Sequence, residues 1–191
     1  MNKKEKIKNI ADIIIGYTFR TAIEPQNNGI LAVVQAKDII GELLIKDEAL
    51  TMIAYQEYKT PAILQKNDIL VSTKGNFRAA VFKGNPENAI ASSSVHILRL
   101  KNDYIVSEFL AIYLNSSILQ RKIAKASTGG AIKAILKKDL ADLEIVIPTV
   151  NDQEKIINIY KNNKKQQELL KQTQFLKNKI TEGIINKILN K

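Results

Sequence analysis

Arginine is scarce in this chain, and two of its four arginines fall in expected loops, where their side chains could do chemistry. Arg20 closes the segment 16–20, which also holds Tyr17, and Arg78 closes the segment 74–78. A guanidinium donates two parallel hydrogen bonds to O6 and N7 of guanine, whereas a lysine ammonium acts mainly as a point charge. We therefore interpret Arg20 and Arg78 as candidates for reading bases. The other two arginines, expected in a strand and a helix, are interpreted as structural or phosphate-facing.

Lysines, short hydroxyl side chains and glycine amides near these loops suit contacts with phosphate, which fix the register of a duplex without choosing its sequence. Gly129 and Gly130, with Ser127 and Thr128 before them, offer amides and hydroxyls of this kind. Taken singly, each residue is equally well explained by ordinary turn chemistry, but their combination in a basic chain favours DNA. The expected DNA contacts are Tyr17, Arg20, Lys74, Asn76, Arg78, Lys83, Ser127, Thr128, Gly129, Gly130 and Lys133.

The residue types needed for common catalytic centres are missing or incomplete. The chain has no cysteine and one histidine, His96, which excludes thiolate metal sites, disulfides and multi-histidine sites. Gly129-Gly130 lacks the G-x-x-x-x-G-K-S/T pattern of a phosphate loop, and Asn85-Pro86 lacks the continuation of a nucleic-acid methyltransferase motif. No acid–lysine pair near the expected loops has the partner acid of a nuclease metal site. We expect a non-enzyme without cofactor or metal.

The charge of the chain favours a polyanionic partner. Its 191 residues include 29 Lys and Arg against 19 Asp and Glu, a net charge of +10 with a pI near 9.6. Each phosphate that Lys or Arg neutralises releases condensed counterions, so such a chain gains affinity for DNA. A lysine-rich surface that only aids solubility is the alternative. No segment is long and apolar enough to span a membrane, and we expect a cytoplasmic protein with no membrane partner.

The first hundred residues consist of short β-branched runs separated by polar or glycine-containing turns, the pattern of half-buried strands. We expect strands over residues 30–35, 51–54, 69–72, 79–82 and 95–100. Between the third and fourth of these, Gly75 can supply the positive φ of a tight connection. This places Arg78 at a hairpin tip.

Helical periodicity follows. Apolar side chains over residues 107–125 recur at helical spacing, and basic residues in the closing turn complement the negative end of the helix dipole. A second short helix is expected over 137–143, followed by a strand over 144–147 that ends at Pro148. The fold class is therefore α+β: a mainly β domain with packed helices, followed by a long C-terminal coiled-coil helix.

That helix is expected from Asp152 to Asn190. Asn151, with Glu154 three residues later, gives a capping-box-like start, and no proline interrupts the segment. Nine lysines against four acidic residues give 151–191 a net charge of +5. An isolated helix of this kind is marginal in water, so it must pack on a second helix or fold back on its own domain. The expected dimer or partner contacts, most of them on a stripe near the coiled-coil period, are Ile156, Tyr160, Leu169, Leu176, Ile180, Ile184 and Ile188.

The order of motifs after residue 127 resembles a known family. A Gly-Gly loop at 127–133 is followed by Leu-x-x-Leu-x-Ile-x-Ile-Pro, ending at Pro148, and by Asp152-Gln153-x-x-Ile at the start of the helix. Further matches lie at 68–75 and 104–125. The pattern is similar to the target-recognition domain and following spacer helix of type I restriction-modification specificity subunits. The similarity spans most of the chain, and the order of the motifs matters more than any single one.

The resemblance implies a target-recognition, DNA-binding domain over 1–150 and a spacer or dimerisation helix over 151–191. Full-length members carry two of each, so this chain resembles a half-subunit that pairs as a homodimer and reads a bipartite, inverted sequence in double-stranded DNA. The implied partners are a methyltransferase (modification) subunit, which supplies S-adenosylmethionine-dependent adenine methylation, and an ATP-driven restriction or translocase subunit. Two departures are Pro148-Thr149 in place of the family's Pro-Pro, and a +5 helix that would repel its twin unless charges are staggered or neutralised.

Two other functions stay open at this point. One is a protein–protein interaction module whose helix docks on a partner, with DNA binding incidental. The other is a DNA-modifying enzyme of unrecognised type. Gel shifts with and without heparin separate specific recognition from incidental binding, and S-adenosylmethionine binding tests the enzyme.

Overall fold

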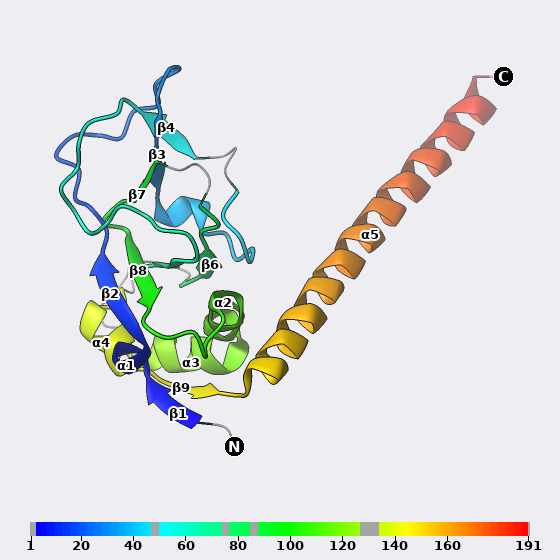
Figure 1. Cartoon of the computed structure of the whole chain (residues 1–191). Coiled ribbons are helices and arrows are strands. Elements are labelled where there is room, and N and C mark those ends of the chain that lie inside the picture. The colour runs from blue at the N-terminus through cyan, green and yellow to red at the C-terminus, as the bar shows by residue number, and fades with distance from the viewer. Residues whose placement is uncertain (1–2, 47–49, 74–76, 85–87, 127–133, 191) are drawn as a thin grey trace. The chain divides into compact units, whose positions relative to one another are not determined.

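The computed structural model describes residues 3–46, 50–73, 77–84, 88–126 and 134–190 (Figure 1). The chain divides into two compact units, Met1–Gln153 and Glu154–Lys191. The first unit is built of β-sheets and short helices, and the second continues one long helix. The α+β class expected from the sequence is confirmed.

The larger sheet has four antiparallel strands in the order β2 (Ala11–Ile15), β8 (Val95–Leu100), β5 (Ile69–Ser72), β6 (Ala79–Val81). The central strand β5 is buried along its whole length, as expected for an apolar run covered on both faces. β5 and β6 form the expected hairpin. The predicted strands over 69–72 and 95–100 are confirmed at both ends, and β6 is one residue shorter than predicted.

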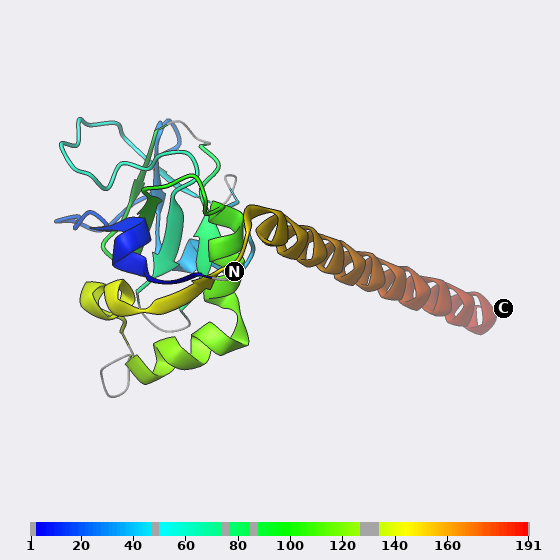
Figure 2. The same ribbon diagram turned by 60° about the horizontal axis from the view of Figure 1, so that its bottom comes forward.

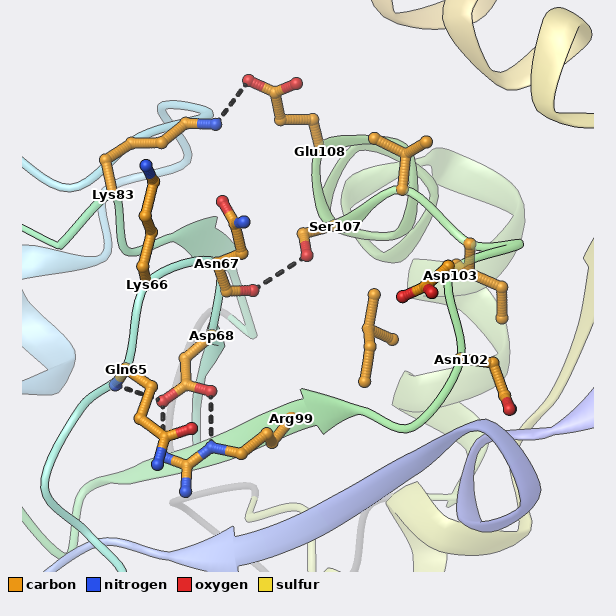
Figure 3. Close-up of a pocket in the computed structure, with 13 residues that line it drawn as sticks. Gln65, Lys66, Asn67, Asp68, Lys83, Arg99, Asn102, Asp103, Ser107 and Glu108 are labelled. Carbon is orange, nitrogen blue, oxygen red and sulfur yellow. Dashed lines mark hydrogen bonds and ion pairs between the residues drawn. The ribbon is translucent and has the colours of Figure 1, made fainter.

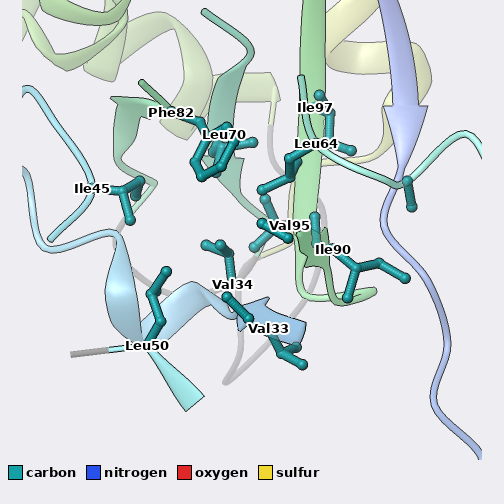
Figure 4. Close-up of a cluster of buried hydrophobic side chains, with 14 of the residues drawn as sticks. Val33, Val34, Ile45, Leu50, Leu64, Leu70, Phe82, Ile90, Val95 and Ile97 are labelled. Carbon is teal, nitrogen blue, oxygen red and sulfur yellow. The ribbon is translucent and has the colours of Figure 1, made fainter. Parts of the chain in front are cut away.

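The second sheet has the order β4 (Thr51–Ile53), β3 (Leu31–Val34), β7 (Ala89–Ala91). β3 runs antiparallel to β4 and parallel to β7. Side chains from both sheets form one apolar core, in which Val33 and Ile90 meet Leu70, Phe82 and Ile97 (Figure 4). A short 3₁₀ helix, η1 (Ala36–Asp38), follows β3.

The N-terminal residues pair with a strand from the far end of the same unit. β1 (Lys3–Lys6) is antiparallel to β9 (Glu144–Ile147), the strand that the sequence predicted at these bounds. α1 (Ile7–Ile10) and α4 (Lys137–Asp142) lie side by side (Figure 2), and Lys8 Nζ lies 2.8 Å from Asp142 Oδ1. β1, β2, β7 and α1 were not predicted from the sequence.

The single helix predicted over 107–125 is wrong, because α2 (Ser107–Asn115) and α3 (Ser117–Ala126) are separated at Ser116. Ser116 is extended, with ψ of 148°, and its Oγ accepts from the Leu119 amide at 3.4 Å, which caps α3. Asn115 accepts from the Ala79 amide (2.9 Å) and donates to the Ala79 carbonyl (2.8 Å). The Asn115 side chain therefore satisfies backbone groups of β6, the edge strand.

The long helix α5 extends over Val150–Leu189, which is 40 residues, or about 60 Å. Its cap differs from the prediction: the hydroxyl of Thr149 accepts from the Asp152 amide (3.3 Å) and donates to the Asp152 carboxylate (2.8 Å). Asn151 with Glu154 is therefore not the cap.

Gln153 is fully buried and fixes residues 148–153 to the segment before α2. Its Oε1 accepts from the Val106 amide at 2.9 Å, and its Nε2 donates to the carbonyls of Tyr104 (2.8 Å) and Pro148 (3.0 Å). Glutamine has a structural role at this position, because its buried carboxamide satisfies three backbone groups.

Candidate nucleic-acid interface

Two of the predicted loops leave the four-stranded sheet at the same end. β2 and β5 flank β8 and run antiparallel to it, so both end beside the first residues of β8. The amide of Gly16 donates to the Val95 carbonyl at 3.0 Å. The amide of Thr73 donates to the Ser94 carbonyl at 3.0 Å. The loop that carries Arg20 and the β5–β6 hairpin therefore start next to each other.

Ile135, which follows the segment 127–133 in the sequence, lies at this end of the sheet as well. The amide of Ile135 donates to the Thr73 carbonyl at 3.0 Å. The Ile135 carbonyl accepts from Nε2 of His96 at 3.3 Å. His96 is buried, and its Nδ1 has no hydrogen-bond partner among the described residues. Burial lowers the pKa of His96; the bond to Ile135 opposes this shift and the charge of Lys137 adds to it.

Seven of the eleven predicted DNA contacts lie outside the described residues, so their placement stays a prediction. They are Lys74, Asn76, Ser127, Thr128, Gly129, Gly130 and Lys133. Tyr17, Arg20, Arg78 and Lys83 are described, and each has different surroundings.

Arg20 lines a surface hollow of about 430 Å³ formed by the loops after β2 and after β4. Three aromatic rings line it too: the Tyr17 ring lies 5.0 Å from those of Phe19 and Tyr58, edge to face in both cases. Such contacts join the two loops. Arg20 itself is exposed and has no hydrogen-bond or ion-pair partner in the described part of the chain. Its guanidinium is therefore available to a ligand.

Two glycines let these loops approach their neighbours closely. A Cβ on Gly16 would lie 1.9 Å from the Ser92 carbonyl oxygen, and one on Gly29 would lie 2.7 Å from the Ile53 amide nitrogen. Neither position admits a side chain without a backbone shift. The path of the loop that holds Tyr17 and Arg20 is thus set by close backbone contacts at both of its ends.

Arg78 is partly buried against α3. Its Nη1 lies 3.3 Å from Gln120 Oε1 and 3.4 Å from the Phe77 carbonyl, both long hydrogen bonds. Its Cδ would lie 3.4 Å from a Cβ on Gly41, whose φ is +92°. These contacts hold the side chain in one direction. Nε and Nη2 have no partner among the described residues, so two groups of donors stay available.

Lys83 is not brought together with the other predicted contacts, because it follows β6 at the opposite end of the sheet. It pairs with Glu108 at 2.9 Å in a second hollow of about 520 Å³ (Figure 3). In the same hollow Arg99 forms two bonds to Asp68, of 2.9 and 2.8 Å. Asp68 is buried, and its hydrogen bonds raise the pKa of Arg99. Here the geometry agrees with a structural role for Arg99.

Exposed cations border the segment 127–133 on both sides in the sequence. Arg121 and Lys122 lie on α3 before it, and Lys137 and Lys138 lie on α4 after it. Of these four, sequence reasoning considered only Arg121 as a phosphate-facing residue. Solvated cations of this kind can contact phosphate, and such contacts add affinity without base preference.

The second unit carries an exposed apolar stripe. Leu169, Leu176, Ile180, Ile184 and Ile188 are 52–66% exposed. Ile156 is 37% exposed and Tyr160 is half-buried. Apolar side chains at this period on one helix face suit a helical partner.

The residues that the structure describes contain no group of three or more His, Cys, Asp or Glu side chains placed to hold a metal ion. Within those same residues, no helix combines the length and apolar character needed to cross a bilayer.

The architecture is an α+β domain of short strands and helices followed by one long helix. The family model described as "Type I restriction modification DNA specificity domain" matches residues 2–189, so the chain belongs to that family. The family's description is one of recognition, in agreement with the expectation of a non-enzyme. The comparison with curated proteins found no match.

Solved structures share the fold. The HsdS subunit from Thermoanaerobacter tengcongensis is 21% identical with a TM-score of 0.64, and 91% of this chain covers 40% of that one. A chain from a study of complex assembly and conformational transition of the type I R-M system is 20% identical with a TM-score of 0.69, at the same coverage. The S subunit of the type I system from M. genitalium is 21% identical with a TM-score of 0.58, with 88% of this chain covering 40% of it. The chain thus spans about two fifths of the length of these subunits.

Proposed function

We propose that the chain is the sequence-specific DNA-recognition subunit of a type I restriction-modification system, with residues 1–150 as its target-recognition domain. The observation that supports this most strongly is the hydrogen bond between Ile135 and Thr73, which joins the bases of two predicted DNA-contacting loops beside the start of a third. Loops clustered at one end of a rigid sheet can follow one face of a duplex. The cations of α3 and α4 are available for its phosphates.

Selection of bound duplexes from a random pool by the intact chain tests this proposal. An enriched motif that survives heparin competition is the expected result. Recovery of unrelated sequences, with binding that heparin abolishes, would overturn it and favour an interaction module with incidental DNA affinity. S-adenosylmethionine binding by the purified chain would instead favour an enzyme.

Two copies of the chain pair through residues 151–191 in this proposal, and the pair reads a bipartite, inverted sequence. The exposed stripe from Leu169 to Ile188 supports pairing, since five large apolar side chains on one helix face are costly to leave in water. An inverted repeat in the selected DNA motif is the expected result.

The paired chain then recruits the methyltransferase (modification) subunit and the restriction or translocase subunit in the cytoplasm. Exposed apolar and basic residues along α5 support a docking role, because residues 151–191, with a net charge of +5, suit acidic partner surfaces. Co-purification of the chain with the modification subunit of its own system tests this step. Co-elution with wild type but not with a variant of the α5 stripe is expected.

A further inference from the structure

The hollow beside Arg20 differs in chemistry from the basic surface near the segment 127–133. No lysine lines it, and its polar side chains include the carboxamides of Gln26 and Gln56, with Glu24 and Thr21 as further hydrogen-bonding groups. Phosphate contacts favour positive charge, whereas base edges are matched by donor and acceptor pairs. This set of side chains suits base edges.

The two carboxamides are also unused within the protein. Gln26 and Gln56 are exposed, and in the part of the chain that the structure describes neither side chain has a hydrogen-bond partner. By contrast, the side chains of Gln35, Gln120 and Gln153 each bond to described neighbours. A carboxamide has one donor and one acceptor side, which matches N7 and N6 of adenine in the major groove.

Backbone bonds hold the first of these loops at Gln26, and a ring contact joins it to the loop that carries Gln56. The amide of Gln26 donates to the Met52 carbonyl at 2.9 Å, and the amide of Ile30 donates to the Ile53 carbonyl at 3.1 Å. The Tyr17–Tyr58 ring contact joins the same two loops on the other side of the hollow. Side chains on a preorganised loop lose less conformational entropy on binding. Direct contacts from such loops therefore discriminate well between bases.

We infer that Gln26 and Gln56 are specificity-determining residues that bind adenine edges of duplex DNA, next to the base that Arg20 reads. The inference rests on the proposed DNA-recognition function and adds to it the residues and the base. The DNA site should therefore hold A·T pairs at the positions next to the base pair that Arg20 contacts.

Pool selection with wild type, Gln26→Ala and Gln56→Ala tests the inference. Each variant should lose an adenine preference at one position and bind the wild-type motif about 10-fold more weakly. Binding to a scrambled duplex and the salt dependence of affinity should stay unchanged, since no phosphate contact is removed. Gln56→Glu should move the preference at its position toward cytosine, because a carboxylate accepts from N4 of cytosine.

Gln65→Ala is the matched control, because Gln65 is an exposed glutamine in the other hollow at the opposite end of the sheet. It should leave the motif unchanged. If both alanine variants keep every adenine preference, or lose equal affinity on motif and scrambled duplex, the inference is overturned. If wild type itself selects no motif, the proposed function fails instead, so the two failures are distinguishable. Thermal unfolding of each variant checks that the fold is kept.

Discussion

The backbone amide of Ile135 donates a hydrogen bond to the carbonyl oxygen of Thr73 across 3.0 Å. Thr73 precedes the hairpin loop 74–76 and Ile135 follows the segment 127–133, so one backbone contact joins two loops that are distant in the sequence. The buried ring of His96 bonds to Ile135 from the neighbouring strand. The end of the sheet therefore joins the residue before the hairpin loop to a residue just after the segment 127–133.

The histidine at this junction makes stability depend on pH. His96 has an ordinary pKa of 6.5, which burial lowers in the folded chain, so below pH 6.5 the unfolded chain binds more protons. The neutral ring thus contributes its full stabilisation above about pH 6.5. This contribution is lost as the pH falls from there through the lowered pKa of the folded chain. Urea unfolding between about pH 5 and pH 8 should show this loss in wild type, with a slope of up to about 1.4 kcal/mol per pH unit for one proton.

His96→Gln is the control, because a glutamine amide can still donate to Ile135 and does not titrate. Both proteins share the same carboxylates, so the difference between their two pH curves reports His96 alone. Parallel curves below pH 6.5 would show that the unpartnered Nδ1 accepts a proton in the folded chain as easily as in water.

Backbone proximity at Gly16 should make this glycine irreplaceable. A Cβ there would lie 1.9 Å from the Ser92 carbonyl oxygen, so Gly16→Ala must shift β2 or the turn before β8 and should lower the free energy of unfolding by about 3 kcal/mol. Gly183→Ala is the matched control, since no atom lies within 4 Å of the added carbon and alanine stabilises a helix interior by about 1 kcal/mol over glycine. Chemical denaturation monitored by circular dichroism gives both values, and equal effects would contradict the contact at Gly16.

Gln153 offers a third test, because the motif position that identified the start of α5 is also a buried polar bridge. Gln153→Ala would leave the Val106 amide and the Tyr104 carbonyl without their partner, and we expect a loss of about 3 kcal/mol in unfolding free energy. Asn151→Ala, two residues away and exposed, should change stability by less than about 0.5 kcal/mol. Similar midpoints for the two variants in urea would mean that water replaces the glutamine at no cost.

Local patterns predicted the elements whose side-chain period is complete within a few residues. The strands at β3, β5 and β8 and the helix α5 are of this kind. The break at Ser116 was missed although Ser116 itself, whose hydroxyl caps α3, is a local signal. The contact of Asn115 with Ala79 could not be predicted, because the two residues are distant in the sequence. β1 was missed for the same reason, since a charged four-residue run becomes a strand only by pairing with β9.

Candidate site residues were predicted by type better than by position. The expected β5–β6 hairpin already implied that Lys83, after its second strand, would lie at the opposite end from the hairpin loop, but residue type and proximity in sequence were weighed instead. Gln26 and Gln56 carried no local signal, because their loops are brought together by contacts between residues distant in the sequence, such as those of Gly29 with Ile53 and of Tyr17 with Tyr58. Non-local backbone contacts therefore account for most of what the sequence did not reveal.

Arg78 should contribute base preference through the orientation of its guanidinium group rather than through its positive charge. Its bond to Gln120 points the guanidinium, so Arg78→Ala should weaken binding to the selected motif by about 1–3 kcal/mol and relax one base pair. Arg78→Lys keeps the charge and loses the bidentate geometry, and it should relax the same base pair while retaining affinity for scrambled duplex. Lys74→Ala, by comparison, should weaken all duplexes about equally. Equal losses on motif and scrambled DNA for Arg78→Ala would assign Arg78 to phosphate.

Self-association through α5 should depend on the apolar stripe and on ionic strength together. Ile180 is 63% exposed on that stripe, so Ile180→Asp should shift the chain from dimer to monomer in sedimentation velocity. Asn178→Asp introduces the same charge off the stripe and should leave the dimer intact. Because residues 151–191 carry +5, raising the salt concentration should strengthen pairing by screening repulsion, even as it weakens binding to DNA. A wild-type chain that stays monomeric at high concentration and high salt would leave the stripe to another protein, and the inverted two-part site would then have to be read by a single copy.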